Sequence, residues 1–224
     1  MKSKRVTISV SETQTVSAVL SIPDRTQPET AVIVAHGAGN DMNNPLLVFF
    51  CDTLADAGYL AVRFNFPYKE RGRRAPDRPE ILEETWRQVW DFVKSKAGYS
   101  LQKIFAAGKS MGGRVASEML AHGSLQACGI IFLGYPLHPA GNKEKLRDQH
   151  LYQIKVPMLF FAGTRDPLCD LDLLKPILKH LGTRAQWLVI EGADHSFNVP
   201  KSSGLTTSEI YERIARQSVR WLER

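Results

Sequence analysis

A serine stands between two glycines in the sequence GKSMG at residues 108–112, which fits the pattern G-x-S-x-G. The pattern follows the apolar segment 104–107 and precedes a helical pattern that begins near Met111, and this strand–turn–helix order is typical of a nucleophilic serine. Glycines two positions before and after Ser110 leave room for a sharp turn, and the helix N-terminus favours negative charge that develops beside it. The pattern alone also fits a glycine-rich turn with a capping serine, but its place between a strand and a helix favours the nucleophile.

The hydroxyl of a serine is a poor nucleophile near neutral pH, so a base and an acid must accompany Ser110. In a sheet that carries such a serine, the acid follows a later strand and the histidine follows the last one. Asp166 follows the apolar segment 157–162, and His195 follows the segment 186–190. We therefore predict that His195 removes the proton of Ser110 and that Asp166 holds the imidazole in the required tautomer.

Three other aspartates compete with Asp166 for the role of the acid. Asp170 and Asp172 lie where a predicted helix begins, so N-terminal capping explains them better. Asp194 directly precedes His195, and neighbouring residues in a loop diverge, so we expect Asp194 to point away. No cluster of side chains has metal-ligand spacing, and we predict neither a metal nor a cofactor.

Acyl transfer builds negative charge on a substrate oxygen, and two backbone N–H groups directed at that oxygen stabilise it. We expect one of them from Met111, the residue after the nucleophile, and the other from the loop after the predicted strand at 31–35. That loop reads HGAGN at 36–40, and its glycines allow the backbone to turn toward the site. We assign the second donor to Ala38, with Gly37 as the alternative.

These residues need a sheet that brings the ends of several strands together. Apolar, β-branched runs alternate with amphipathic helical patterns, which predicts a mostly parallel, twisted sheet of about seven to eight strands with helices on both faces. Ligands of such sheets bind beyond the carboxyl ends of the strands, and the candidate residues all follow predicted strands. We predict a single α/β domain over residues 1–224, of the α/β-hydrolase fold, with no large cap domain. The predicted strands are 5–10, 15–22, 31–35, 59–64, 104–107, 129–133, 157–162 and 186–190, and the predicted helices are 45–57, 80–96, 111–122, 171–181 and 206–222.

The interval 137–156 lies where large cap domains are often inserted. It connects the predicted strand 129–133 to the predicted strand 157–162, which precedes Asp166. It is too short for a cap domain, so we expect a shallow, open site that suits small or short-chain acyl groups. Six residues near predicted strand ends could form its walls, namely Phe66, Tyr68, Tyr135, Leu137, His138 and Phe197.

The segment 67–79 is rich in arginine, glycine and proline and is predicted to be a loop. Its part from Lys69 to Arg78 carries five basic and two acidic residues, a net charge of +3, on the side of the predicted site. A solvated loop is the favoured interpretation, with recognition of an anionic substrate group or of a protein partner as alternatives.

The whole-chain composition is that of a soluble globular protein, with 43% hydrophobic and 23% charged residues and a net charge of +6. Cys51 and Cys128 lie in apolar surroundings and are interpreted as buried thiols, which favours a reducing compartment. We find no signal-peptide pattern and no apolar run long enough to span a membrane, and we expect a cytoplasmic protein. We expect no membrane or nucleic-acid partner, a small-molecule substrate, and a monomer or weak homodimer.

The motifs HGAG, GKSMGG, GTRDP and GADHSF together resemble the small, cap-less α/β-hydrolases related to dienelactone hydrolase. The stretches RFNFPY, GYPLHP and KLRDQHLY add a closer resemblance to the group that contains testis-expressed protein 30 and the hydrolase-like domain of a nonspecific-lethal complex subunit. The resemblance runs from about residue 31 to the C-terminus and implies the triad Ser110, Asp166 and His195. Dienelactone hydrolases carry cysteine at the nucleophile, so their substrate is not implied here. Some relatives of the closer group look non-catalytic.

Two functions follow as expectations. The first is hydrolysis of a carboxylic ester or thioester of a small or short-chain acyl group through an acyl-enzyme on Ser110, with amides less favoured. The second is a catalytically weak binding or scaffold module that keeps the hydrolase fold. The intact set of nucleophile, base, acid and oxyanion donors favours the first.

Overall fold

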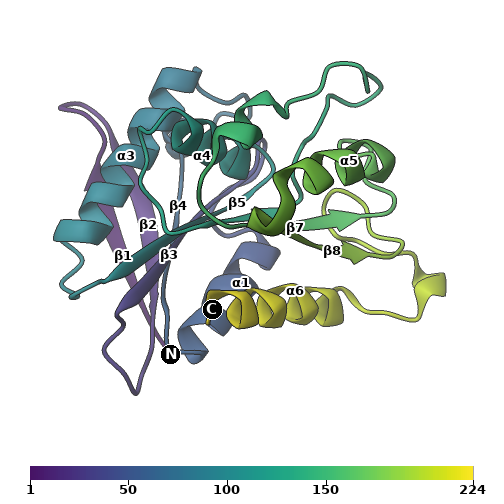
Figure 1. Ribbon diagram of the computed structural model, residues 1–224. Helices are drawn as coiled ribbons and strands as arrows, with labels where there is room; N and C mark the ends of the chain where they lie inside the picture. The colour runs from purple at the N-terminus through teal and green to yellow at the C-terminus, as the bar shows by residue number, and fades with distance from the viewer. Residues whose placement is uncertain (224) are drawn as a thin grey trace.

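The protein is described by a computed structural model that covers residues 1–223, and it contains one eight-stranded sheet (Figure 1). The strand order is β1-β2-β4-β3-β5-β6-β7-β8; the β1–β2 and β2–β4 pairs are antiparallel and the other five pairs are parallel. The predicted mostly parallel α/β sheet is thus confirmed. The strands are β1 (Lys2–Ser9), β2 (Thr15–Ile22), β3 (Thr30–Ala35), β4 (Leu60–Phe64), β5 (Lys103–Lys109), β6 (Ile130–Leu133), β7 (Met158–Gly163) and β8 (Ala185–Ile190).

Helices cover both faces of the sheet, as predicted. Figure 1 shows α1 and α6 on one face and α3, α4 and α5 on the other. The alternation of side chains along a strand explains the two layers, because Ile33 of β3 packs into one hydrophobic cluster while its neighbours Val32 and Val34 pack into the other. The helices are α1 (Pro45–Asp56), α2 (Pro67–Glu70), α3 (Pro79–Ser95), α4 (Met111–Ala121), α5 (Leu171–Leu181) and α6 (Thr207–Leu222).

The short helix α2 corrects the prediction of a loop over the whole of residues 67–79. Pro67 occupies the first turn of α2, where its fixed φ and missing N–H are tolerated, so the arginine-rich segment begins with one helical turn. The rest of the segment, up to the start of α3 at Pro79, is irregular as predicted.

The chain changes direction at β3, and this places the candidate site. From β3 the chain passes to β4 on one side and then crosses to β5 on the other side of β3. The loops that leave the carboxyl ends of β3 and β5 therefore diverge, and such a switch point is where open α/β sheets bind ligands. The loop at 36–40 and the serine after β5 both lie at this point.

The segment 137–156 forms no cap domain. It contains the 3-10 helix Gln149–Gln153, which packs against α4 and α5, and is otherwise irregular. None of the helices within residues 1–223 combines the length and the apolar character that crossing a membrane would require.

Candidate active site

Ser110 occupies the sharp turn between β5 and α4, with φ 50° and ψ −116°. Such a conformation is strained for a residue with a side chain. Its glycine neighbours are required by close packing. A Cβ on Gly108 would lie 2.2 Å from the nitrogen of Gly113, and one on Gly112 would lie 2.6 Å from the carbonyl oxygen of His36. The turn therefore has the geometry of a nucleophile elbow, with the half-buried serine directed away from the sheet.

The structure brings Ser110, His195 and Asp166 into one hydrogen-bonded row. His195 Nε2 lies 2.8 Å from Ser110 Oγ, and His195 Nδ1 lies 2.7 Å from Asp166 Oδ2. The Asp166 side chain is 1% exposed, and its Oδ1 accepts a hydrogen bond of 2.8 Å from the Leu168 N–H. A carboxylate only accepts, so Nδ1 carries the proton and Nε2 presents a lone pair to the serine hydroxyl. This is the protonation pattern that a general base for Ser110 needs.

The competing aspartates have other partners. Asp170 caps α5 by accepting from the Asp172 N–H, and Asp172 pairs with Lys175 in the first turn of that helix. Asp194 accepts hydrogen bonds from the N–H groups of Ser196 and Asn198, and so shapes the loop that carries His195. None of these contacts reaches the imidazole.

The predicted oxyanion donors lie in the two segments next to the serine. Met111 is the first residue of α4, and Gly37 approaches so closely that a Cβ on it would lie 3.3 Å from Ser110 Cβ. Among the described residues, the N–H groups of Met111, Ala38 and Gly37 donate no hydrogen bond within the protein. All three are therefore available as donors, and the oxyanion hole stays a prediction.

The orientation of the Ala38 N–H follows from the clamp on the preceding carbonyl. The Gly37 oxygen accepts from His36 Nδ1 at 2.8 Å, from the Asn40 N–H at 3.3 Å and from the Tyr68 hydroxyl at 3.4 Å. The peptide bond is trans, so its N–H points opposite to its C=O. Because the carbonyl is held toward the buried side chains of His36 and Tyr68, the Ala38 N–H points away from them, outward.

His36, to which the sequence analysis gave no role, is hydrogen-bonded to the loop that contains the predicted oxyanion donors. It is fully buried, its Nε2 accepts from the Phe66 N–H at 3.1 Å, and its Nδ1 must therefore be the protonated nitrogen that donates to Gly37. Burial lowers the pKa of His36 to about 4, so the ring stays neutral and the tautomer is fixed. The sequence did offer a signal for this contact, because His36 lies directly after the predicted strand 31–35 and directly before Gly37.

The six side chains predicted to form pocket walls are instead in the core, and none is more than 1% exposed: Phe66, Tyr68, Tyr135, Leu137, His138 and Phe197. Phe66 and Tyr68 pack edge-on against the His36 ring, with centroids 5.0 and 5.7 Å away. Both side chains pack against the loop at residues 36–40 from the interior, and they offer no surface to a substrate. The error arose because residue type and position after a strand do not reveal which way a side chain turns.

The other predicted wall residues have structural partners as well. Tyr135 packs against Phe132 and donates from its hydroxyl to the Arg147 carbonyl at 2.6 Å. His138 Nε2 accepts from the Asp170 N–H at 3.0 Å, which secures the start of α5. Phe197, with φ 64°, lies beneath the ammonium of Lys109. These contacts keep the predicted wall residues in the core, whereas Ser110 itself is partly exposed.

Part of the positive charge of the segment 69–78 is paired with a carboxylate of the same segment. Arg71 and Arg73 both approach the buried carboxylate of Asp77. Glu70 accepts from the Ser17 N–H at 2.8 Å and from the Asn65 side chain at 3.0 Å. These contacts attach the segment to the rest of the fold, while the four arginines Arg71, Arg73, Arg74 and Arg78 remain exposed. The role of their charge stays open between solvation and recognition of an anionic group or a protein partner.

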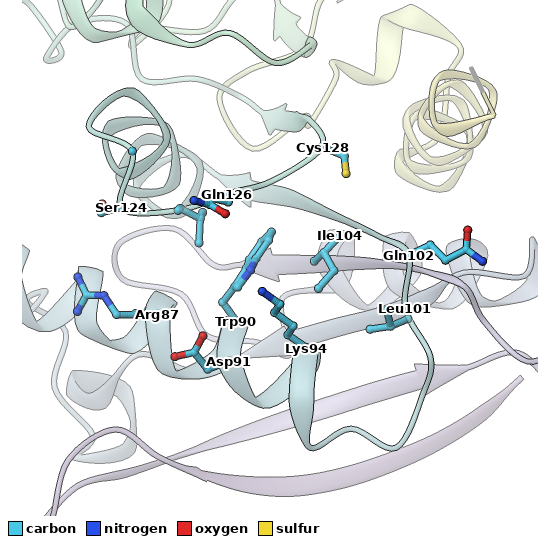
Figure 2. Close-up of a pocket in the computed structure, with 12 residues that line it drawn as sticks. Arg87, Trp90, Asp91, Lys94, Leu101, Gln102, Ile104, Ser124, Gln126 and Cys128 are labelled. Atoms are coloured by element: carbon cyan, nitrogen blue, oxygen red, sulfur yellow. The ribbon is translucent and has the colours of Figure 1, made fainter.

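The cysteine interpretation needs one correction. Cys51 is buried as predicted, but Cys128 is exposed and borders a groove of about 390 Å³ that also contains Trp90 and Lys94 (Figure 2). This groove lies at the amino ends of β5 and β6, whereas Ser110 follows the carboxyl end of β5. The apolar neighbours of Cys128 belong to the following strand, whereas the cysteine itself precedes that strand in a connection. Within the described chain, no three side chains of the histidine, cysteine and acidic types converge as a metal site would require.

Comparisons with known proteins agree with the fold. An alpha-beta serine hydrolase homologue from Coxiella burnetii matches with a TM-score of 0.75 at 20% identity, over 96% of each chain. Dienelactone hydrolase from Anabaena variabilis matches with a TM-score of 0.75 at 20% identity, over 99% of this chain and 97% of that one. A serine hydrolase without a lid from Xanthomonas campestris gives a TM-score of 0.72 at 18% identity, over 98% and 95%. At these identities the likeness concerns the fold. The sequence model of the alpha/beta hydrolase domain matches residues 28–223, and the chain therefore belongs to the alpha/beta hydrolase family.

Proposed function

We propose that this protein is a serine hydrolase that cleaves carboxylic esters or thioesters of small or short-chain acyl groups through an acyl-enzyme on Ser110. The observation that carries the proposal is the row Asp166–His195–Ser110, with hydrogen bonds of 2.7 and 2.8 Å, next to the unpaired N–H groups of Ala38 and Met111. Membership of a hydrolase family and the likeness to serine hydrolases support it.

The proposed reaction begins when Ser110 Oγ attacks the acyl carbon and His195 Nε2 takes the hydroxyl proton. The negative charge that develops on the carbonyl oxygen faces the Ala38 and Met111 N–H groups, each of which is worth about 3 kcal/mol to the transition state in comparable sites. Asp166 stabilises the imidazolium, which then gives its proton to the leaving alcohol or thiol. A water molecule, activated in turn by His195, hydrolyses the acyl-enzyme and restores Ser110.

The preference for short acyl groups rests on the surroundings of Ser110. The segment 137–156 builds no cap, and the aromatic side chains near the strand ends lie in the core. A long acyl chain therefore finds little apolar surface to cover it, and each methylene left in water forfeits about 0.8 kcal/mol of burial.

The experiment that tests the proposal is labelling with a fluorophosphonate, followed by mass spectrometry of the peptide that contains Ser110. We expect one adduct on Ser110, its loss in Ser110→Ala, and turnover of short acyl esters and thioesters in preference to long ones. Absence of an adduct under conditions that label a known serine esterase would refute the enzymatic proposal and favour a binding module with the hydrolase fold. If Ser110 is labelled but long acyl esters are turned over faster than short ones, only the preference for short acyl chains is refuted.

A further inference from the structure

The side chain of Lys109 connects the end of β5 to the loop that carries His195. Its Nζ donates a hydrogen bond of 2.5 Å to the backbone carbonyl of His195. The same ammonium lies 5.7 Å from the centroid of the Phe197 ring, two residues further along that loop. Lys109 thus contacts the loop at the backbone of His195, whereas Asp166 and Ser110 contact its imidazole.

The charge of Lys109 has a cost that packing alone does not explain. The residue is 5% exposed, and none of the ion pairs within 4.0 Å among the described residues includes it, although Asp166 and Asp194 are near enough to interact with its charge. A buried ammonium without such a partner is unfavourable, and an apolar side chain of similar length would fill the same space without that penalty. The hydrogen bond from the ammonium to the His195 carbonyl therefore best explains why a lysine stands at this position.

The path of this side chain is narrow. Gly134, with φ +79°, lies between the end of β6 and the His195 loop, and a Cβ there would lie 3.4 Å from Lys109 Nζ and 3.6 Å from His195 Cε1. The Lys109 ammonium and the His195 imidazole therefore both lie close to Gly134.

We propose that Lys109 is a positioning residue, whose ammonium anchors the carbonyl of His195 and thereby keeps the imidazole aligned between Asp166 and Ser110. The consequence for catalysis rests on the proposed function, whereas the anchor itself can be measured without any substrate. Lys109 does not touch the reacting atoms in this scheme and acts through His195.

A dependence on pH follows from the burial of the ammonium. Burial lowers the pKa of Lys109 to about 8, and the nearby carboxylates of Asp166 and Asp194 oppose part of this shift. Burial raises the pKa of Asp194, but hydrogen bonds from Asn198 and Ser196 outweigh it and hold that pKa below its ordinary value. Burial lowers the pKa of His36 to about 4, so neither Asp194 nor His36 changes charge between pH 7 and about 9.5. Lys109 is charged below pH 8 and neutral above it, and a neutral amine donates a weaker hydrogen bond. The anchor should therefore be intact below pH 8 and weaken as the pH rises through that value.

The experiment compares the wild-type protein, Lys109→Met, Lys109→Arg and Lys103→Met by fluorophosphonate labelling between pH 6.5 and about 9.5. Methionine matches the length of lysine without donating, arginine keeps the charge over the whole range, and Lys103 is an exposed lysine at the other end of β5. We expect the wild-type rate to fall above pH 8, and Lys109→Met to be slower by up to about 100-fold below pH 8, with no alkaline decline. Lys109→Arg should recover most of the rate and also lack the decline, and Lys103→Met should behave as the wild type.

A second measurement separates this inference from the proposed function. The proton on His195 Nδ1, bonded to Asp166, should give a low-field ¹H resonance in the wild type that weakens or shifts in Lys109→Met. If the wild type is not labelled but the resonance changes in this way, the anchor stands and the proposed function fails. An unchanged resonance, or an unchanged alkaline decline in Lys109→Met, overturns the inference. If Lys109→Met does not fold, Lys109→Arg decides, because an alkaline decline that persists in it overturns the inference.

Discussion

Replacing Asp166 by Asn tests the row of hydrogen bonds with almost no change in shape. Asp166 Oδ1 accepts from the Leu168 N–H at 2.8 Å, and an asparagine keeps this bond only if its own oxygen takes that place. Its amide NH₂ then faces His195 Nδ1, at the position from which Oδ2 now accepts at 2.7 Å. Nδ1 must become the acceptor, so the proton moves to Nε2, the nitrogen that faces Ser110. An imidazole in this tautomer cannot remove the serine proton.

The size of the effect follows from charge and tautomer together. An imidazolium and a carboxylate about 4 Å apart interact by about 4 kcal/mol at an effective dielectric constant of about 20, which corresponds to about 10³ in rate. The inverted tautomer adds about another factor of ten, and the total agrees with the loss of about 10⁴ seen for this substitution in a serine protease. One hydrogen bond, worth about 1 kcal/mol, is at stake for folding, so the melting temperature should fall by no more than about 4 °C.

The assay is kcat/KM on the ester that the substrate panel selects, with a thermal melt for each variant. Asp170→Asn and Asp194→Asn are the controls, and both should stay within about tenfold of the wild type, because asparagine can cap a helix or accept from a backbone N–H as aspartate does. An active Asp166→Asn beside an inactive Asp194→Asn would show that the hydrogen-bonded row does not define the acid.

Three further outcomes are expected. Ser110→Gly should abolish labelling yet raise the melting temperature by at least about 2 °C, since glycine removes backbone strain of about 1–3 kcal/mol; a lower melting temperature would contradict the strain argument. His36→Phe keeps a ring in the core but loses the clamp that turns the Ala38 N–H outward, so the labelling rate should fall by about 10²-fold in a folded protein, and an unchanged rate would refute the clamp. Cys128 should react quickly with a water-soluble disulfide reagent in the native protein, while the two buried thiols, whose pKa values burial raises to about 12, should react only on unfolding; rapid reaction of all three would contradict their burial.

The parts of the fold that were predictable have strong local signals. Alternating apolar runs separated by turn residues located all eight strands, and the helix 171–181 was placed at its observed bounds. The grouping of Ser110, Asp166 and His195 was predictable because chain order and the ends of parallel strands fix their meeting point. Their catalytic roles, the cytoplasmic location and the closer family group stay predictions.

The parts that were not predictable depend on the direction of single side chains. Phe66 and Tyr68 have the composition of a pocket wall, but their orientation is decided by packing around His36. Lys109 occupies a variable position of the G-x-S-x-G pattern, where a lysine is normally assigned to solvent. Only the three-dimensional path past Gly134 shows that it is buried. The interpretation of Cys128 failed similarly, because exposure in a connection is set by neighbours that are distant in sequence.

That the segment 137–156 forms no cap domain has a consequence for selectivity. Sites for small molecules commonly enclose about 70–90% of the ligand surface, and much of their affinity comes from that enclosure. A site that no cap domain covers encloses less of its ligand, so under the proposed function Michaelis constants should lie toward the upper end of the usual range of about 1 μM to 1 mM. Substrates would then be distinguished mainly by the intrinsic lability of the acyl bond, and activated thioesters and aryl esters would outcompete alkyl esters of the same acid. In the cell, such an enzyme would be directed less by molecular fit than by which reactive acyl compounds accumulate around it.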